Sequence, residues 1–191
     1  APQAQLITIG NFLADPALDA LYVELTTGDA PAAPTEPTGE NTDITIPDVP
    51  VKKQVIIADG IKLSRTPVTK EEAIQAAGEL LKDLGYVDET YVAAMQEREK
   101  LVSTYIGMGV AIPHGTTQAK GTVKKTGIVF FQYPEGVDFG AEKAQLVFGI
   151  AGIGDEHLEL LSKLCSLLED PVRLETLKTT KDVNWVLEQL S

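Results

Sequence analysis

Residues 127–132 read Gly-Ile-Val-Phe-Phe-Gln, and residues 145–150 read Gln-Leu-Val-Phe-Gly-Ile. Both stretches lack the alternation of polar and apolar side chains that a strand with one face in water shows. Strands covered by helices on both faces have this composition. A shorter apolar stretch, Val110 to Ile112, comes before them. The three stretches predict an α/β fold with a mainly parallel or mixed central sheet, flanked by helices on both faces.

Two helices are predicted ahead of these strands. Thr69-Lys70-Glu71-Glu72 is a capping box, apolar residues follow it at helical spacing, and Gly85 occupies the position that glycine favours just beyond a helix. The segment from Asp88 to about Lys100 predicts a second helix, with Val92 and Met95 facing inward.

Two more helices are predicted after the last strand. Asp155 can cap a helix that runs to about Glu169, where Pro171 ends it. Cys165 lies within the apolar stripe of that helix, so we expect it to be a core residue. Asp182 to Leu190 predicts a closing helix.

Each of the two histidines follows a predicted strand. His114 comes between Pro113 and Gly115, so that proline fixes the backbone before the imidazole and glycine allows close approach after it. His157 falls in the first turn of a predicted helix, where backbone N–H groups attract anions. Ligand sites of α/β sheets favour strand ends. Each histidine also has a simpler interpretation: His114 could merely cap its strand, and His157 could be an exposed first-turn residue.

Composition excludes several classes of protein. With 28 acidic and 16 basic residues, the formal net charge is -12. Binding to nucleic acid or to an anionic membrane surface needs clustered Lys and Arg instead. No stretch approaches the roughly 18 consecutive apolar residues of a membrane span. The single cysteine allows neither an internal disulfide nor a Cys-rich zinc site, which fits a reducing cytoplasm.

Charge and proline content divide the chain near residue 50. Residues 1–50 hold seven of the 11 prolines and eight acidic residues, but no Lys or Arg. Residues 29–50 are rich in Pro, Ala, Thr and Asp, which is typical of an extended linker. Residues 1–28 could supply one strand and one helix, too little to bury a core. We therefore expect residues 1–28 to end another domain, residues 29–50 to be a flexible linker and residues 51–191 to form the α/β domain.

The strand end at His114 belongs to a longer pattern. Glu99 is followed, after six residues, by Ile106-Gly107-Met108-Gly109-Val110-Ala111-Ile112-Pro113-His114-Gly115. This pattern resembles the signature of the type 2 IIA domains of sugar phosphotransferase systems, over about residues 54–190. Gln132-Tyr133-Pro134-Glu135-Gly136-Val137 resembles the mannitol branch more than the fructose or nitrogen-regulatory branches. Asn11-Phe12-Leu13 resembles the end of a mannitol IIB domain.

The resemblance implies a phosphoryl carrier with an α/β fold. The histidine at the position of His114 takes a phosphoryl group on Nε2 from the phosphohistidine of HPr and passes it to a cysteine of a IIB domain. His157 would lie beside it and hydrogen-bond to the imidazole or the phosphoryl group, and Arg98 would help to form the polar site. A neutral imidazole suits this task, and the reaction needs alignment and charge stabilisation rather than a cofactor or metal.

The expected partners follow from the same resemblance: HPr, a IIB domain of the same permease and, indirectly, a IIC membrane domain. The IIA domain itself would be cytoplasmic, at the inner face of the membrane, without inserting into it. Met108 departs from the pattern, because mannitol relatives often carry Glu there, so a role of that carboxylate in charge balance does not carry over. The alternative is a regulatory IIA-like module that controls transcription or nitrogen metabolism, although the IIB-like start favours transport of mannitol or fructose.

Overall fold

The centre of the fold is a five-stranded sheet with the strand order β1-β4-β5-β3-β2. The structure is a computed structural model that describes residues 54–191. The expected IIB remnant (1–28) and linker (29–50) lie outside the described residues. The strands are β1 (Ile61–Lys62), β2 (Tyr105–Gly107), β3 (Val110–Ala111), β4 (Gly127–Asp138) and β5 (Lys143–Ala151). The pairs β1–β4 and β3–β5 are parallel, whereas β4–β5 and β2–β3 are antiparallel. The sheet is therefore mixed, one of the two arrangements that the sequence predicts.

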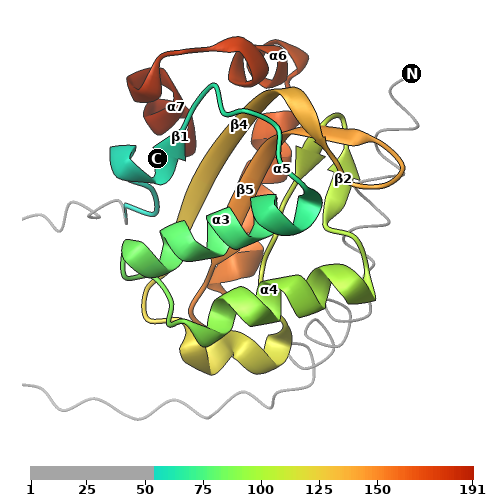
Figure 1. Cartoon of the computed structure of the whole chain (residues 1–191). Helices are drawn as coiled ribbons and strands as arrows, with labels where there is room; N and C mark the ends of the chain where they lie inside the picture. Colours follow the sequence, from blue (N-terminus) through green and yellow to red (C-terminus); the bar gives the residue numbers. More distant parts are fainter. Residues whose placement is uncertain (1–53) are drawn as a thin grey trace, which may run out of the picture.

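Helices cover both faces of this sheet (Figure 1). Helices α3 (Lys70–Asp83) and α4 (Thr90–Leu101) lie on one face, together with the 3-10 helix η2 (Thr117–Thr122). Helices α5 (Glu156–Leu168), α6 (Pro171–Thr179) and α7 (Val183–Leu190) lie on the other, and a short 3-10 helix η1 (Ala58–Gly60) precedes β1. The predicted layering of helices on both faces is confirmed.

The apolar runs that predicted the fold are its two central strands. Phe130 of β4 pairs with Phe148 of β5, and their ring centroids are 4.9 Å apart in the core beneath α5. The alternate residues Val129 and Val147 pack on the α3 side. All four side chains are buried, so neither face of these strands meets water. This two-sided burial explains why the runs carry no alternation of polar and apolar residues.

Local signals placed the first two helices well. The side chain of Thr69 accepts a hydrogen bond from the Glu72 amide, and the Glu72 carboxylate accepts one from the Thr69 amide, so the capping box is formed. Gly85 adopts a φ of 77°, a left-handed conformation that suits glycine. In α4, Val92 and Met95 are buried as expected. The closing helix is present, with the Asp182 side chain accepting hydrogen bonds at its N-terminus.

One local prediction at α5 was wrong, and one helix, α6, was not predicted. Asp155 occupies the N-cap position of α5, but its side chain makes no capping hydrogen bond and instead lies 3.3 Å from the Lys120 ammonium. Pro171 follows the end of α5, as predicted, but it is also the first residue of α6, which the sequence reading missed. The side chain of Asp170 caps that helix. Cys165 is buried in the core, as predicted.

None of the helices within residues 54–191 combines the length and the apolar character that crossing a membrane requires.

Candidate active site

The two parallel strands β3 and β5 end at the same edge of the sheet, and His114 lies there. His114 extends the line of β3 and pairs with Ile150 of β5, whose amide donates to the Pro113 carbonyl at 3.0 Å. The imidazole is presented at a strand end, as the sequence predicts, and the residue is 8% exposed. The backbone at His114 is therefore held by hydrogen bonds of the sheet.

The proton of the His114 imidazole is located by a single contact. Nδ1 lies 2.8 Å from the carbonyl oxygen of Ile112. Since a carbonyl oxygen can only accept a hydrogen bond, Nδ1 carries the proton. In the neutral ring the lone pair is then on Nε2, which makes Nε2 the nucleophilic atom.

Tyr91 of α4 holds the chain immediately after His114. Its hydroxyl accepts a hydrogen bond from the Gly115 amide at 2.9 Å and donates one to the Ile150 carbonyl at 2.6 Å. A Cβ atom on Gly115 would lie 2.5 Å from Cε2 of Tyr91, so this position requires glycine. Burial raises the pKa of Tyr91 to about 12. The sequence did not predict a role for this tyrosine. The single related signal was Gly115, whose lack of a side chain makes room for the Tyr91 ring.

His157 is the second residue of α5, just beyond the end of β5. Its Nδ1 atom lies 3.1 Å from the Gly154 carbonyl, which again assigns the proton to Nδ1. The loop before it is tight, because a Cβ atom on Gly152 would lie 2.3 Å from the His157 backbone nitrogen. His114 and His157 therefore follow neighbouring parallel strands at one edge of the sheet, as predicted.

The surroundings of His157 favour its neutral form. Burial lowers the pKa of His157 below its ordinary value. The Gly154 carbonyl acts in the opposite direction, the Lys120 ammonium lowers the pKa further, and the Asp155 carboxylate raises it. With Nδ1 bonded to Gly154, the Nε2 atom of the neutral ring is left able to accept a proton.

The loop that carries His157 is also tied to β4. The Thr126 hydroxyl donates to the Glu156 carboxylate and accepts from the Ile153 amide at 3.1 Å. Thr126 is 3% exposed, so these bonds are shielded from water. They fix the first turn of α5 against the start of β4.

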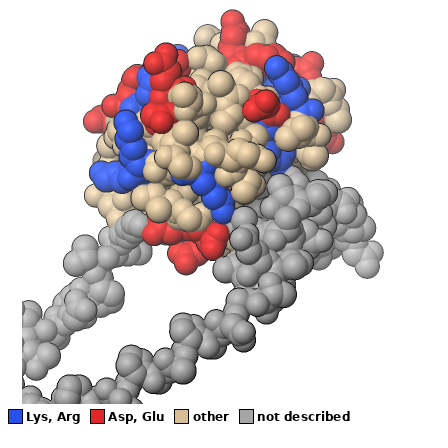
Figure 2. Space-filling model, turned by 90° about the horizontal axis from the view of Figure 1, so that it is seen from below, with Lys and Arg blue, Asp and Glu red and all other residues tan. Residues whose placement is uncertain are grey.

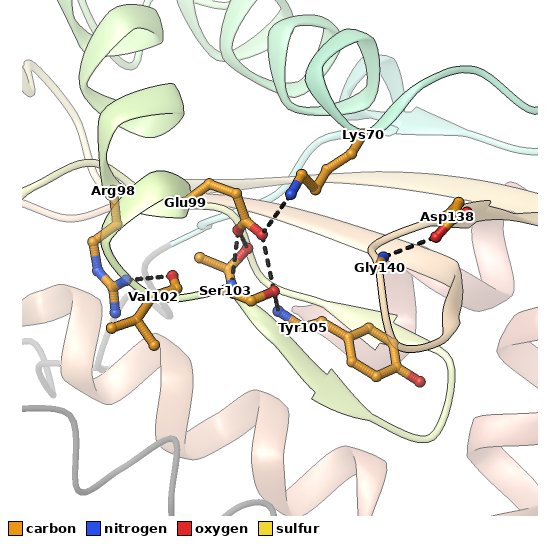
Figure 3. Close-up of polar contacts among 9 residues, drawn as sticks. Lys70, Arg98, Glu99, Val102, Ser103, Tyr105, Asp138 and Gly140 are labelled. Carbon is orange, nitrogen blue, oxygen red and sulfur yellow. Dashed lines mark hydrogen bonds and ion pairs between the residues drawn. The ribbon is translucent and has the colours of Figure 1, made fainter.

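Arg98 reaches the same edge of the sheet from the last turn of α4. It is buried, and its Nη1 donates to the Val102 carbonyl at 2.8 Å (Figure 3). The residues after Val102 then run antiparallel to the strand that leads to His114, since the Ile112 amide donates to the Thr104 carbonyl at 3.0 Å. The segment that Arg98 braces therefore lies alongside residues 112–114. The structure thus places His114 and His157 at one edge of the sheet, and Arg98 against the segment that runs alongside residues 112–114.

A buried carboxylate secures this segment from the other side. Figure 3 shows Glu99 facing Ser103 and the Lys70 ammonium, which lies 3.9 Å away. Glu99 accepts hydrogen bonds from the Thr104 amide at 2.7 Å, the Thr104 hydroxyl at 2.5 Å and the Ser103 hydroxyl at 2.9 Å. The signature pattern includes Glu99, and the structure gives it a role in shaping the turn between α4 and β2.

Met108 lies at the other end of β3 from His114. It has a φ of 57° in the hairpin between β2 and β3. Val110 pairs with Leu146 and His114 with Ile150, so the strand is extended between Val110 and His114, which are about 13 Å apart at roughly 3.3 Å per residue. A carboxylate at position 108 would therefore not contact His114.

The surface around this edge is mostly uncharged. Figure 2 views the molecule from the side of α4 and η2, and its centre is uncharged, with acidic and basic residues around it. Three apolar residues from the segments described above are exposed: Leu101 (71%), Val102 (49%) and Ile153 (46%). Exposed apolar side chains on a surface with few charged residues are typical of a protein-docking face.

Known proteins share both the sequence and the fold. Residues 54–191 match the family model described as phosphoenolpyruvate-dependent sugar phosphotransferase system, EIIA 2. The chain is 42% identical over its whole length to the PTS system mannitol-specific EIICBA component of Escherichia coli (strain K12), but spans only 30% of that relative's length.

Two further matches cover the described residues. The mannitol-specific phosphotransferase enzyme IIA component of Bacillus subtilis (strain 168) is 44% identical over 72% of this chain and 99% of its own. A chain of the NMR structure of the complex of enzyme IIAMTL and phosphorylated enzyme IIBMTL from Escherichia coli is 49% identical, with a TM-score of 0.68 over 71% of this chain and 96% of that one. This chain belongs to the EIIA 2 family of the phosphoenolpyruvate-dependent sugar phosphotransferase system.

Proposed function

We propose that this protein carries phosphoryl groups in the uptake of mannitol, with Nε2 of His114 as the carrier atom. The observation that carries the proposal is the 2.8 Å contact between His114 Nδ1 and the Ile112 carbonyl, which makes Nε2 the nucleophile. The mannitol-specific names of relatives at 42% and 44% identity support the choice of sugar. The phosphoryl donor is phospho-HPr, and the acceptor is a cysteine of a IIB domain.

The transfer is a displacement at phosphorus. The Nε2 lone pair of His114 forms the new N–P bond while the bond to the HPr imidazole breaks, and the HPr nitrogen keeps that bonding pair. His114 retains its Nδ1 proton, so the product ring is formally a cation beside an anionic phosphoryl group. The Ile112 carbonyl stabilises the positive charge that develops on the ring. The ring loses this charge again when the phosphoryl group passes to the IIB thiolate.

Three groups stabilise charge on the phosphoryl oxygens in this proposal. His157 can take a proton at Nε2 and then donate a hydrogen bond, because its Nδ1 already bonds to Gly154. The N-terminal turn of α5 offers backbone amides to an anion. Arg98, which is bonded to the segment alongside residues 112–114, supplies a permanent positive charge. Phosphoryl transfer depends mainly on such positioning and charge stabilisation.

We assign the exposed apolar residues Leu101, Val102 and Ile153 to the docking of the two protein partners. One IIA domain must meet HPr and IIB in turn, and a small apolar face permits weak, short-lived contacts with each. The proposed IIB domain belongs to the same permease, as in the EIICBA relatives. A IIC membrane domain is then an indirect partner, reached through IIB. The protein would then work on the cytoplasmic side of the membrane.

A regulatory IIA-like module remains the alternative. A regulator and a transporter can share the phosphohistidine, but only the transporter delivers the phosphoryl group to a mannitol IIB domain. The IIA–IIB complex of the E. coli relative favours the transporter.

The experiment follows the phosphoryl group in two steps. Incubation with phospho-HPr should give one acid-labile equivalent per chain, and His114→Ala should accept none. Addition of a mannitol-specific IIB domain should then discharge the phosphorylated protein, whereas a fructose-specific IIB domain should do so far more slowly. A His114→Ala variant that still accepts one equivalent contradicts the carrier assignment. If the protein keeps its phosphoryl group in the presence of mannitol IIB, the regulatory alternative is favoured.

A further inference from the structure

The hydroxyl of Tyr91 occupies a special place in the ladder between the His114 segment and β5. In a regular parallel ladder, the bond from the Ile150 amide to the Pro113 carbonyl would be followed by one from the Gly115 amide to the Ile150 carbonyl. The first bond is present at 3.0 Å. The Tyr91 hydroxyl bonds to both groups of the second, at 2.9 and 2.6 Å. It therefore stands at the place of a ladder bond.

This arrangement bears directly on His114. The residue that pairs with Ile150 is His114 itself, and Gly115 is its neighbour in the chain. The Tyr91 hydroxyl is hydrogen-bonded to both backbone groups, so it ties Gly115 to Ile150 of β5. The Tyr91 ring also packs on Gly115, where a Cβ atom would lie 2.5 Å from the ring. Helix α4 thus sets the path of the backbone just after the imidazole.

We infer that Tyr91 is a positioning residue for phosphoryl transfer: through its bonds to Gly115 and Ile150, it holds His114 so that Nε2 faces the incoming phosphorus. The inference rests on the proposed function of His114. Tyr91 does not itself touch the reacting atoms in this scheme. Its hydroxyl stays protonated throughout, since burial raises the pKa of Tyr91 to about 12 and the bond to the Ile150 carbonyl needs the O–H group as donor.

The test compares two tyrosines in the intact chain. Tyr91→Phe removes the bridging hydroxyl and keeps the ring. Tyr86→Phe is the matched control: the Tyr86 ring also packs on a glycine, at 2.3 Å from a Cβ atom built on Gly127, and its hydroxyl makes no hydrogen bond to another residue of the described part of the chain. Single-turnover transfer from phospho-HPr is measured over a range of HPr concentrations, together with the ¹⁵N shifts of the His114 ring.

We expect Tyr91→Phe to slow transfer at saturating phospho-HPr by about ten- to a hundred-fold, because small misplacements of a reacting group have effects of this size. The phospho-HPr concentration that gives half the maximal rate should change less than twofold, and the variant should still accept one phosphoryl group per chain. The His114 ring should show a mixture of tautomers. Tyr86→Phe should match wild type in each respect. A Tyr91→Phe protein that transfers within twofold of wild type, or that slows no more than Tyr86→Phe, overturns the inference.

A second variant keeps the question decidable if Tyr91→Phe does not fold. Gly115→Ala perturbs the same contact from the other side, because its new methyl group meets the Tyr91 ring. A folded Gly115→Ala protein with slowed transfer at saturation supports the inference, and one with the wild-type rate contradicts it. If the wild-type chain accepts no phosphoryl group on His114, the proposed function itself is refuted. That result comes from the wild-type protein alone, so it is distinguishable from any result with a Tyr91 variant.

Discussion

The Nδ1 atom of His114 lies 2.8 Å from the carbonyl oxygen of Ile112, two residues earlier in the same chain. That carbonyl lies between two peptide groups that are bonded to neighbouring segments, since the Ile112 amide donates to Thr104 and the Pro113 carbonyl accepts from Ile150. The acceptor that fixes the imidazole is therefore part of the sheet. A sheet-bound acceptor presents the ring in one orientation and one tautomer before any partner arrives, which lowers the cost of aligning it for transfer.

This relationship predicts the protonation state of the ring. In the unphosphorylated protein with a neutral His114 ring, ¹⁵N spectra should show Nδ1 as the protonated nitrogen and Nε2 as the nitrogen with the lone pair. After reaction with phospho-HPr, the one-bond coupling to ³¹P should appear at Nε2. A ring protonated at Nε2, or a phosphorus coupling at Nδ1, would contradict the assignment of the carrier atom.

Replacement of His157 should slow transfer without unfolding the protein. His157→Ala removes a group that we expect to stabilise the transferring phosphoryl group, and a well-placed donor of this kind contributes about 1.5 to 4 kcal/mol to the barrier. The single-turnover rate with phospho-HPr should fall by about ten- to a thousand-fold. The thermal midpoint should change little, because His157 is only partly buried. Equal rates for variant and wild type in both directions would show that His157 takes no part.

The pKa of His157 should respond to its two charged neighbours in opposite directions. Lys120→Gln removes a cation and should raise the pKa of His157, whereas Asp155→Asn removes an anion and should lower it. Both effects can be read from the NMR titration of the His157 Cε1 proton. Phosphorylation of His114 adds negative charge at the same edge of the sheet and should raise the pKa of His157. If none of the three changes shifts the pKa of His157, then His157 does not lie at the site.

The lowered pKa of His157 also determines how this residue makes folding stability depend on pH. The folded protein holds the pKa of His157 below its unfolded value, so below that value the unfolded chain binds more protons. The contribution of His157 to stability is fully present above the unfolded pKa of about 6.5 and is lost as the pH falls through the folded pKa. His157→Gln should therefore flatten the loss of stability in the mildly acid range, as followed by urea denaturation at several pH values.

The features that the sequence predicted were those set by neighbouring residues. The capping box at Thr69 and the left-handed Gly85 depend on contacts within a few residues, and both formed as expected. The central strands were recognisable because burial on both faces leaves a continuous apolar run. His114 was recognisable because a proline, which fixes the backbone, precedes it and a glycine, which allows close approach, follows it.

The features that were missed depend on distant partners. Strand β1 has two residues, and only its pairing with β4 makes it a strand. Asp155 has the sequence of a cap, yet a lysine 35 residues away takes its carboxylate. In the sequence, Tyr91 is indistinguishable from the other buried residues of α4. Its hydroxyl acquires a role only because it contacts the Gly115 and Ile150 backbones, 24 and 59 residues farther along the chain.

Glu99 should matter for stability in a way that its neighbour Glu97 does not. The Glu99 carboxylate is buried and accepts hydrogen bonds from Ser103 and Thr104, so Glu99→Gln places an amide N–H₂ group against donors. An unsatisfied buried polar group costs about 1 to 3 kcal/mol, and urea denaturation should show a loss of that size. Glu97→Gln, on the exposed side of the same helix, should leave the midpoint unchanged. Equal losses in both variants would exclude the buried network as the cause.

The final prediction concerns residues 1–50, which we propose to be a domain end and a tether that the IIA domain does not need for folding. Within the described residues 54–191, the two core clusters already cover both faces of the sheet and extend from Val55 to Leu190. The B. subtilis relative matches 72% of this chain over 99% of its own length, so a comparable segment exists as a separate protein. Residues 51–191 alone should therefore fold, with the thermal midpoint of the intact chain, and accept phosphate from phospho-HPr at the same rate.

The composition of residues 29–50 predicts what the tether contributes. A flexible segment of about 20 residues has a root-mean-square span of roughly 25 Å, which holds linked partners at an effective concentration near the millimolar range. The contact between IIA and IIB can then be weak, and a carrier that alternates between two partners needs such a contact. In the intact chain, residues 29–50 should give narrow, fast-relaxing NMR signals. If removal of residues 1–50 unfolds the protein or abolishes its phosphorylation, the segment is part of the fold and the tether proposal is wrong.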